Sequence, residues 1–221
     1  MKKIVLAALI SALPLAGLRR WFYRVLMGYE IPSSSTTGFL TVIAVSSFRL
    51  GERVNIGMLN LFKGPIDVRI GDSARIGKCN RFTCSWHITQ ERFKDRHYTP
   101  RLTLGARSLV LDEHFFDVYG EISIGHGSWI AGHQSQFWTH GLSVEDRDIR
   151  IGDNNYIGSA ARFAPGTTIG NNNIVALGSV VLSKLVCDSS LISGFPAKPF
   201  RSIEEDLKKG KYRFSFEDWK D

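Results

Sequence analysis

Six histidines carry most of the candidate chemistry in this chain of 221 residues, because an imidazole can accept a proton from a hydroxyl group near neutral pH. The richest cluster is the segment AGHQSQFWTHG, residues 131–141. Its last histidine, His140, is followed by Gly141, which leaves the backbone room to turn. Five charged residues follow within residues 145–150. We therefore take His140 as the leading candidate for a site residue, placed at the mouth of a loop.

Other catalytic chemistries have weaker support in the sequence. The three cysteines, Cys79, Cys84 and Cys187, are odd in number and lack zinc-ligand spacing, so we expect reduced thiols that pack as small hydrophobic side chains. Neither Cys79 nor Ser135 has a recognisable nucleophile context. We therefore expect neither a covalent intermediate nor a metal site.

A six-residue repeat defines the elements that must position His140. From Ile151 to Val181 the units IGDNNY, IGSAAR, FAPGTT, IGNNNI and VALGSV follow one another without a break. Each begins with an aliphatic or aromatic residue, and its fifth place is small or polar. A period of six fits neither a helix nor an ordinary strand, but it is typical of a chain wound into a triangular coil, about three units per turn. We therefore expect an all-β hexapeptide-repeat solenoid, with the first residue of each unit in the core and the asparagines of residues 154–155 and 171–173 tolerating left-handed corners.

The same unit recurs upstream in fragments. They begin at Leu50, Ile56, Ile70, Ile76, Leu104, Ile124 and Ile130. Two insertions, residues 81–101 and 137–150, interrupt the register. Insertions leave a solenoid as loops, often on the binding face, so we expect His140 to border a loop-lined groove.

The net charge of +7 is concentrated near the start of the chain, where the uncharged residues 4–18 are flanked by lysines and arginines. This apolar stretch is shorter than the roughly 20 residues needed to span a membrane. Three interpretations remain open. The segment is a helix in the membrane interface, with the aromatic residues 21–23 at headgroup level and the arginines facing anionic lipid; or a helix docked on the protein's own core or a partner; or a cleaved secretory signal. The basic residues lie beside an apolar helix rather than along the solenoid, which argues against a nucleic-acid partner.

Residues 124–201 resemble the hexapeptide-repeat acyltransferases, a family that includes sugar and surface-polysaccharide O-acetyltransferases. The resemblance rests on the repeat at residues 151–184 and on the closing segment GFPAKPFR, residues 194–201. It implies a left-handed parallel β-helix, a homotrimer, and acyl-CoA bound between neighbouring subunits. It also implies that His140, which follows a threonine as in the family, is the general base. An acidic or amide residue often orients this histidine; residues 112–114 lie in the right region, but none can be chosen from the sequence.

The resemblance also implies a set of coenzyme-binding residues. These are Ser159 and Ala160 in one coil, Gly178 and Ser179 in the next, and Pro196, Lys198 and Arg201 in the closing segment. Backbone amides would bind the pantetheine, while Lys198 and Arg201 would contact the phosphates. Phe195 and Pro199 depart from the family's usual closing pattern.

Taken together, we expect an acyl-CoA-dependent O-acyltransferase, in the first place an O-acetyltransferase that uses acetyl-CoA. Its acceptor would be a sugar hydroxyl of a surface polysaccharide or lipid-linked glycan. Residues 1–28 would hold it on the cytoplasmic face of the inner membrane. The alternatives are a non-catalytic sugar-binding or scaffold solenoid, and a zinc lyase of the γ-carbonic-anhydrase type. The lyase would need His126, His133 and His140 to meet, which their spacing of seven does not favour.

Three segments are expected along the chain: an apolar and basic segment at residues 1–35, the β-helix at residues 36–201, and a short helix with a capping tail at residues 202–221.

Overall fold

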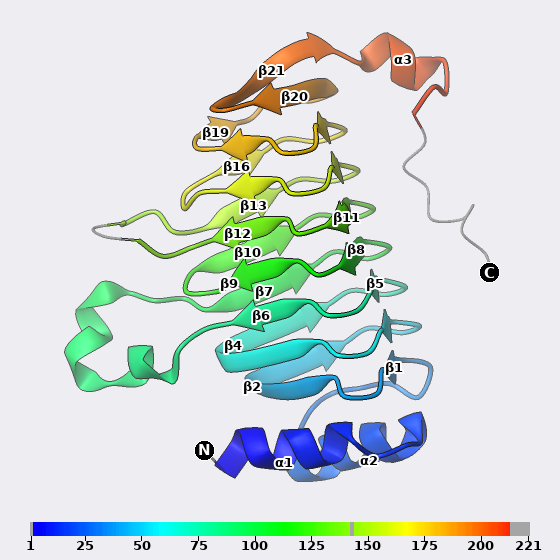
Figure 1. The fold of residues 1–221 in the computed structure, drawn as a ribbon, viewed down its shortest axis with the longest axis vertical. Coiled ribbons are helices and arrows are strands. Elements are labelled where there is room, and N and C mark those ends of the chain that lie inside the picture. The colour runs from blue at the N-terminus through cyan, green and yellow to red at the C-terminus, as the bar shows by residue number, and fades with distance from the viewer. Residues whose placement is uncertain (1, 142–143, 213–221) are drawn as a thin grey trace.

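The computed structural model describes residues 2–141 and 144–212, and in them short parallel strands stack into a three-sided solenoid (Figure 1). Each coil runs along face C, then face A, then face B. Face C carries β1 (Thr36–Thr37), β3 (Asn55–Ile56), β5 (Arg75–Ile76), β8 (Leu109–Asp112), β11 (Trp129–His133), β14 (Tyr156–Ile157), β17 (Ile174–Val175) and β20 (Ser190–Gly194). Face A carries β6 (Arg81–Thr83), β9 (Phe115–Asp117), β12 (Gln136–Trp138), β15 (Arg162–Phe163) and β18 (Val180–Val181). Face B carries β7 (Arg101–Leu104), β10 (Glu121–Ile124), β13 (Ile149–Ile151), β16 (Thr168–Ile169) and β19 (Lys184–Leu185). Two long strands, β2 (Val42–Leu50) and β4 (Leu61–Ile70), run across faces A and B and join them into one sheet.

The six-residue repeat is the structural unit of the upper coils. The residues that open its units are buried, and their strands pair in register one coil apart, for example Phe163 with Val181 and Ile157 with Val175. On face A the core is a column of phenylalanine rings: Phe62, Phe82, Phe116, Phe137 and Phe163, stacked with centroids 4.5 to 4.8 Å apart. The expected hexapeptide-repeat β-helix is confirmed.

The asparagines have two roles, of which the sequence indicated only one. Asn154 and Asn172 take the left-handed conformation at corners, with φ of 53° and 56°. Asn155 and Asn173 are buried instead, and the backbone N–H of Asn173 donates to Asn155 Oδ1 at 2.9 Å. These side chains join successive coils, because each satisfies a backbone group that the corner leaves unpaired.

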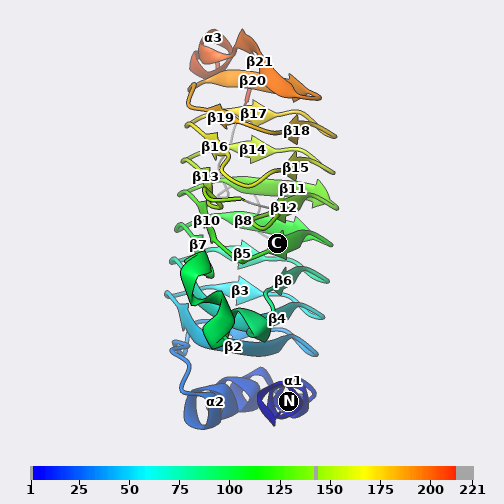
Figure 2. The same cartoon turned by 90° about the vertical axis from the view of Figure 1, so that its left-hand side faces the viewer.

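Both insertions leave the solenoid at the edge where face A passes into face B. The first spans residues 84–100 and contains two 3₁₀ helices, η1 (Trp86–Thr89) and η2 (Glu91–Arg96); it projects over the lower coils (Figure 2). The second leaves the coil between β12 and β13, at residues 139–148. Both are shorter than the sequence suggested, since Phe82 and Phe137, assigned to the insertions, belong to the phenylalanine column.

The N-terminal segment forms two helices at the base of the solenoid (Figure 1): α1 (Lys2–Ser11) packs against β2, and α2 (Ala16–Met27) packs against β1. Ala7, Ile10 and Tyr23 are buried, and the Tyr23 hydroxyl lies 2.9 Å from the Thr41 carbonyl oxygen. The segment therefore docks on the protein's own core through its inner side. No helix in the described residues is long and apolar enough to cross a membrane.

Two expectations for this segment were wrong. Tyr23 does not lie on the surface beside Trp21, because it is buried between the helices and the first coil. Arg19 does not face outward either: its guanidinium donates to the carbonyl oxygens of Thr37, Leu13 and Pro14. It satisfies backbone groups at the break between the helices, which residue types alone do not indicate.

The upper end is covered by a hairpin of β20 and the antiparallel β21 (Ala197–Ser202), followed by the short helix α3 (Glu204–Lys208). Most of the tail that we expected to cap the last coil, from residue 213 onward, lies outside the described residues.

Candidate active site

His140 lies at the edge between faces A and B, directly after β12. Its Nδ1 is 2.6 Å from Oδ2 of Asp117, which ends β9 one coil below. The side chain of Asp117 is 5% exposed and that of His140 is 46% exposed. A buried carboxylate thus holds one nitrogen of an imidazole whose other side reaches solvent.

The coil fixes this pair rather than leaving it to a mobile loop. Asp117 Oδ2 also accepts hydrogen bonds from the backbone N–H groups of Thr139 and His140, each at 3.2 Å. The buried Thr139 hydroxyl accepts from the backbone N–H groups of Tyr119 at 2.7 Å and Gly120 at 3.0 Å, and donates to the Asp117 carbonyl. The threonine before the histidine therefore binds two coils together at the point where chemistry is expected.

The arrangement selects one form of the imidazole. The Asp117 carboxylate can only accept, so Nδ1 of His140 carries the proton and donates it. Nε2 then keeps a free lone pair, and the ring is steadied by Tyr119, whose centroid lies 4.4 Å away. Such a histidine can take a proton from a hydroxyl group, and the carboxylate stabilises the imidazolium that forms.

Asp117 is the candidate site residue that the sequence did not indicate. The region it pointed to, residues 112–114, lies at the edge between faces C and A: Asp112 accepts from the Lys78 backbone at 2.8 Å, and the buried His114 accepts from that of Ser135 at 3.0 Å. Burial lowers the pKa of His114 to about 4. Aligning the phenylalanine column would have identified Asp117, since Phe116 pairs with Phe137 and so places Asp117 beside Trp138.

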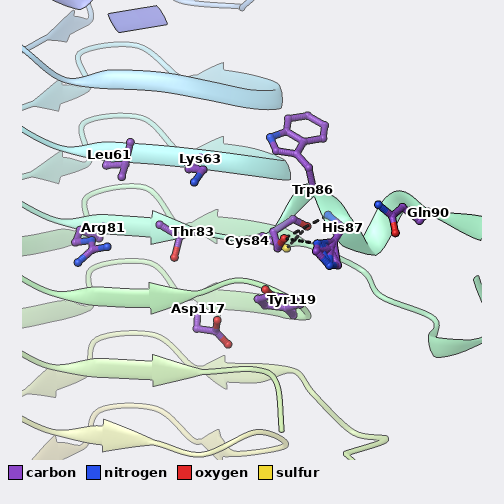
Figure 3. A pocket seen from close by; sticks show the side chains of 11 residues that line it. Leu61, Lys63, Arg81, Thr83, Cys84, Trp86, His87, Gln90, Asp117 and Tyr119 are labelled. Atoms are coloured by element: carbon purple, nitrogen blue, oxygen red, sulfur yellow. Dashed lines mark hydrogen bonds between the residues drawn. The ribbon is translucent and has the colours of Figure 1, made fainter. Parts of the chain in front are cut away.

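A cavity of about 950 Å³ opens on face A beside Asp117 and Tyr119 (Figure 3). We call it the face A cavity. Its walls come from β4, β6 and the first insertion: Leu61, Lys63, Arg81, Thr83, Cys84, Ser85, Trp86, His87 and Gln90. Burial, with Asp117 nearby, raises the pKa of the Cys84 thiol to about 12, which disfavours the nucleophilic thiolate form. A substrate in this cavity would contact Asp117 and Tyr119, the two side chains that hold the His140 ring.

The residues predicted to hold coenzyme lie on the other border of face A and at the top of the solenoid. Ser159, Ala160, Gly178 and Ser179 form successive corners between faces C and A, and the N–H of Gly178 donates to the Ser159 carbonyl at 2.9 Å. Pro196 lies between β20 and β21, and Lys198 is exposed on β21. The structure thus aligns the predicted pantetheine residues in one column, separate from the edge that carries His140.

Arg201 is committed elsewhere in the chain. Its guanidinium lies 2.7 Å from Asp206 Oδ2 in α3 and 3.2 Å from the Tyr212 hydroxyl. The pair with Asp206 raises the pKa of Arg201 and lowers that of Asp206. Lys198 makes no ion pair in the described part of the chain, which leaves it as the better candidate for a phosphate contact.

The three histidines required by a zinc lyase occupy three different edges. His126 follows β10, His133 ends β11, and His140 follows β12. Within residues 2–141 and 144–212, no group of three or more His, Cys, Asp or Glu side chains is placed to hold a metal ion.

Comparisons with known proteins agree with the fold. Residues 148–183 match the family model described as bacterial transferase hexapeptide (six repeats). The chain is 33% identical over 122 residues to "Putative acetyltransferase SAV2555" of Staphylococcus aureus, covering 51% of this chain and 61% of the relative. It is 41% identical over 113 residues to "Putative acetyltransferase C18B11.09c" of Schizosaccharomyces pombe, covering 50% and 54%. The matched segment thus spans between half and two thirds of each relative.

Among solved structures, the chain resembles the polysialic acid O-acetyltransferase OatWY, with a TM-score of 0.57 and 21% identity over 79% of this chain and 84% of that one. At that identity the likeness shows the fold alone. The resemblance to the hexapeptide-repeat transferases is confirmed by the family model over residues 148–183, and the β-helix fold by the likeness to OatWY.

Proposed function

Taking the hexapeptide-transferase repeats as the premise, we propose that this chain is an acetyltransferase that moves an acetyl group from acetyl-CoA to a hydroxyl group of a saccharide. The observation that carries the proposal is the contact of 2.6 Å between His140 Nδ1 and Asp117 Oδ2, beside a large cavity. This pair leaves Nε2 free to accept the proton of a hydroxyl group. The relatives named above support acetyl transfer as the reaction class.

In the proposed reaction, the hydroxyl oxygen attacks the thioester carbonyl as its proton passes to His140 Nε2. The tetrahedral intermediate collapses, the carbon–sulfur bond breaks, and the coenzyme thiolate takes up the proton from the imidazolium. The acetyl ester and free CoA are the products. No covalent enzyme intermediate is needed, which fits the buried, protonated Cys84.

The direct test is the release of free CoA from acetyl-CoA in the presence of saccharides, with mass spectrometry of the acceptor. The proposal requires both CoA release and an acceptor that gains one acetyl group. CoA release without acceptor acetylation would indicate hydrolysis, and coenzyme binding with no turnover on a broad saccharide panel would favour the non-catalytic solenoid.

We further propose a homotrimer, with the coenzyme between the corner column of one subunit and a neighbour. The edge that carries His140 and the column at Ser159 and Gly178 border the same face, so an adjacent subunit could bring a second column close to the histidine. Light scattering gives the assembly state directly, at three times the chain mass.

Lys198→Ala should raise the KM for acetyl-CoA about three- to tenfold and leave the KM for the acceptor unchanged. The lysine is exposed, so its contact with a coenzyme phosphate is partly screened. Arg201→Ala is the matched control, because its guanidinium is occupied by Asp206, and it should change this KM less. The reverse order of the two variants would show that Arg201 leaves α3 to hold the coenzyme.

We also propose that the outer side of the N-terminal helices rests on the cytoplasmic face of the inner membrane, where a lipid-linked saccharide would be within reach. Val5 and Leu9 of α1 and Leu18, Trp21 and Val25 of α2 are exposed, between 42% and 66%. Lys2 and Arg24 are exposed beside them. Apolar side chains flanked by cations are suited to the interface of an anionic bilayer.

Replacing Val5, Leu9, Trp21 and Val25 together by serine should abolish co-sedimentation with vesicles of anionic phospholipid. Each substitution removes apolar area from the lipid contact, and the buried contacts of α1 with β2 and of α2 with β1 stay intact. Leu177→Ser with Leu182→Ser, two exposed leucines on the upper coils, is the control and should bind normally. Deletion of residues 1–28 is a poorer test, since it uncovers the base of the solenoid. Wild-type protein that stays in the supernatant would contradict the anchor.

A further inference from the structure

The face A cavity carries more positive than negative charge. Lys63 and Arg81 line it, and within the described chain neither cation has a carboxylate at ion-pair distance. Asp117 is the one acidic residue in its wall, and three N–H groups already bond its Oδ2. The cavity therefore presents two uncompensated cations next to the catalytic pair.

The positive surface continues away from His140 toward the N-terminal helices. A second cavity of about 420 Å³ shares Lys63 and Trp86 with the first, and Lys3 of α1 contributes to its wall. Lys63, Thr83 and Asp117 are paired in register on three successive coils, so the two cavities follow one column of face A (Figure 3). The two cavities and the wall they share extend from Asp117 to α1, a longer site than one sugar ring requires.

An aromatic surface stands where the two cavities meet. Trp86 begins η1 in the first insertion, is 42% exposed, and lines both cavities. A tryptophan in such a position offers a flat apolar face together with a polar edge, which suits a ring that has one apolar face and hydroxyl groups at its rim. The cations on either side would bind charged groups of the same chain of sugars.

We propose that the two cavities together bind a negatively charged oligosaccharide, with the acceptor sugar beside His140 and the following sugars running past Trp86 toward Lys3. The charge would come from ring carboxylates or from phosphate esters, which Lys and Arg bind through the same kind of charge-assisted hydrogen bond. The inference names the substrate class of the proposed acetyl transfer and so rests on that function.

The test measures binding without acetyl-CoA, by titration calorimetry with three tetrasaccharides of equal length: one carboxylated, one phosphorylated and one neutral. Wild-type protein should bind at least one charged probe ten times or more tighter than the neutral one. Lys63→Gln with Arg81→Gln should weaken binding of that charged probe about 10- to 100-fold, roughly three- to tenfold per cation, and leave the neutral probe unchanged. Arg49→Gln removes one positive charge from the neighbouring face B, where Arg49 pairs with Glu30, and should have no effect on either probe.

The preferred charged probe identifies the source of the charge. Equal affinity for the neutral and charged probes overturns the inference, and so does a double variant that binds as the wild type does. Acetyl transfer to the same three probes separates this result from the proposed function. If the neutral probe is acetylated as well as the charged ones, the transferase assignment stands and the charge preference fails. If a charged probe binds through Lys63 and Arg81 but no probe is acetylated, the binding site stands and the transferase assignment fails.

Discussion

The His140→Ala variant should fold normally and transfer acetyl groups about 10² to 10⁴ times more slowly than the wild type, the usual contribution of a general base. The imidazole is half-exposed and contacts Asp117 and Tyr119 through its ring, so its removal leaves no cavity in the phenylalanine core. The loss should fall on kcat, with the KM values for both substrates little changed. Initial rates of CoA release, with circular dichroism as the check on folding, measure this.

His133→Ala and His126→Ala are the matched controls, since both histidines lie at other edges of the solenoid. They should keep most of the activity. A His140→Ala enzyme with wild-type turnover, together with an inactive His133→Ala enzyme, would show that the general base is His133, at the edge between faces C and A.

Asp117→Asn should lower kcat by a comparable factor although the side chain keeps its shape. An asparagine amide can donate to Nδ1 of His140, which leaves the proton on Nε2, where the lone pair is needed; such a tautomer change is costly in the serine-protease triad. The backbone N–H groups of Thr139 and His140 share Oδ2 with Nδ1, so an amide nitrogen in that place also leaves both of them without an acceptor. A loss of stability of about 1 to 3 kcal/mol should therefore accompany the loss of rate. Asp112→Asn, at the edge between faces C and A, is the control and should be nearly fully active.

A double variant separates positioning from general structural damage. If Asp117 acts through His140, then Asp117→Asn combined with His140→Ala should be no slower than His140→Ala alone, because residues that act as a unit are not additive. Additive losses would contradict the pairing. The nitrogen chemical shifts of the His140 ring offer an independent reading, since they should report a proton on Nδ1 in the wild type.

The fold was predictable because a solenoid repeats one local rule. The unbroken units from Ile151 to Val181 specify which side chains point inward, and each coil then stacks on an equivalent one. The rule ends at the insertions. Between Phe116 and Phe137 the step is 21 residues, which is no multiple of six, so counting in sixes does not place Asp117 one coil below the Trp-Thr-His segment; only matching the two phenylalanines does.

The candidate site was predictable only where chemistry follows a local motif. His140 could be chosen from its neighbours in the chain, whereas its partner Asp117 is 23 residues away and is brought near by register alone. The same limit applies at the ends. The Arg19 guanidinium donates to backbone carbonyl groups, and that of Arg201 pairs with Asp206 of α3. The positions of charged residues in the sequence do not reveal these hydrogen bonds and ion pairs.

Asp117 and His140 belong to different coils, and the hydrogen bonds of β9 with β12 set the step between them. The distance between the two side chains therefore depends on the rise from one coil to the next and on the register of β9 with β12. A single residue gained or lost between positions 118 and 138 would shift this register and separate Asp117 from His140, even though both side chains are still present. Length changes are best absorbed beyond the histidine, in the excursion that returns to β13. In this architecture the stacking of the phenylalanine column on face A sets the spacing of the candidate site residues.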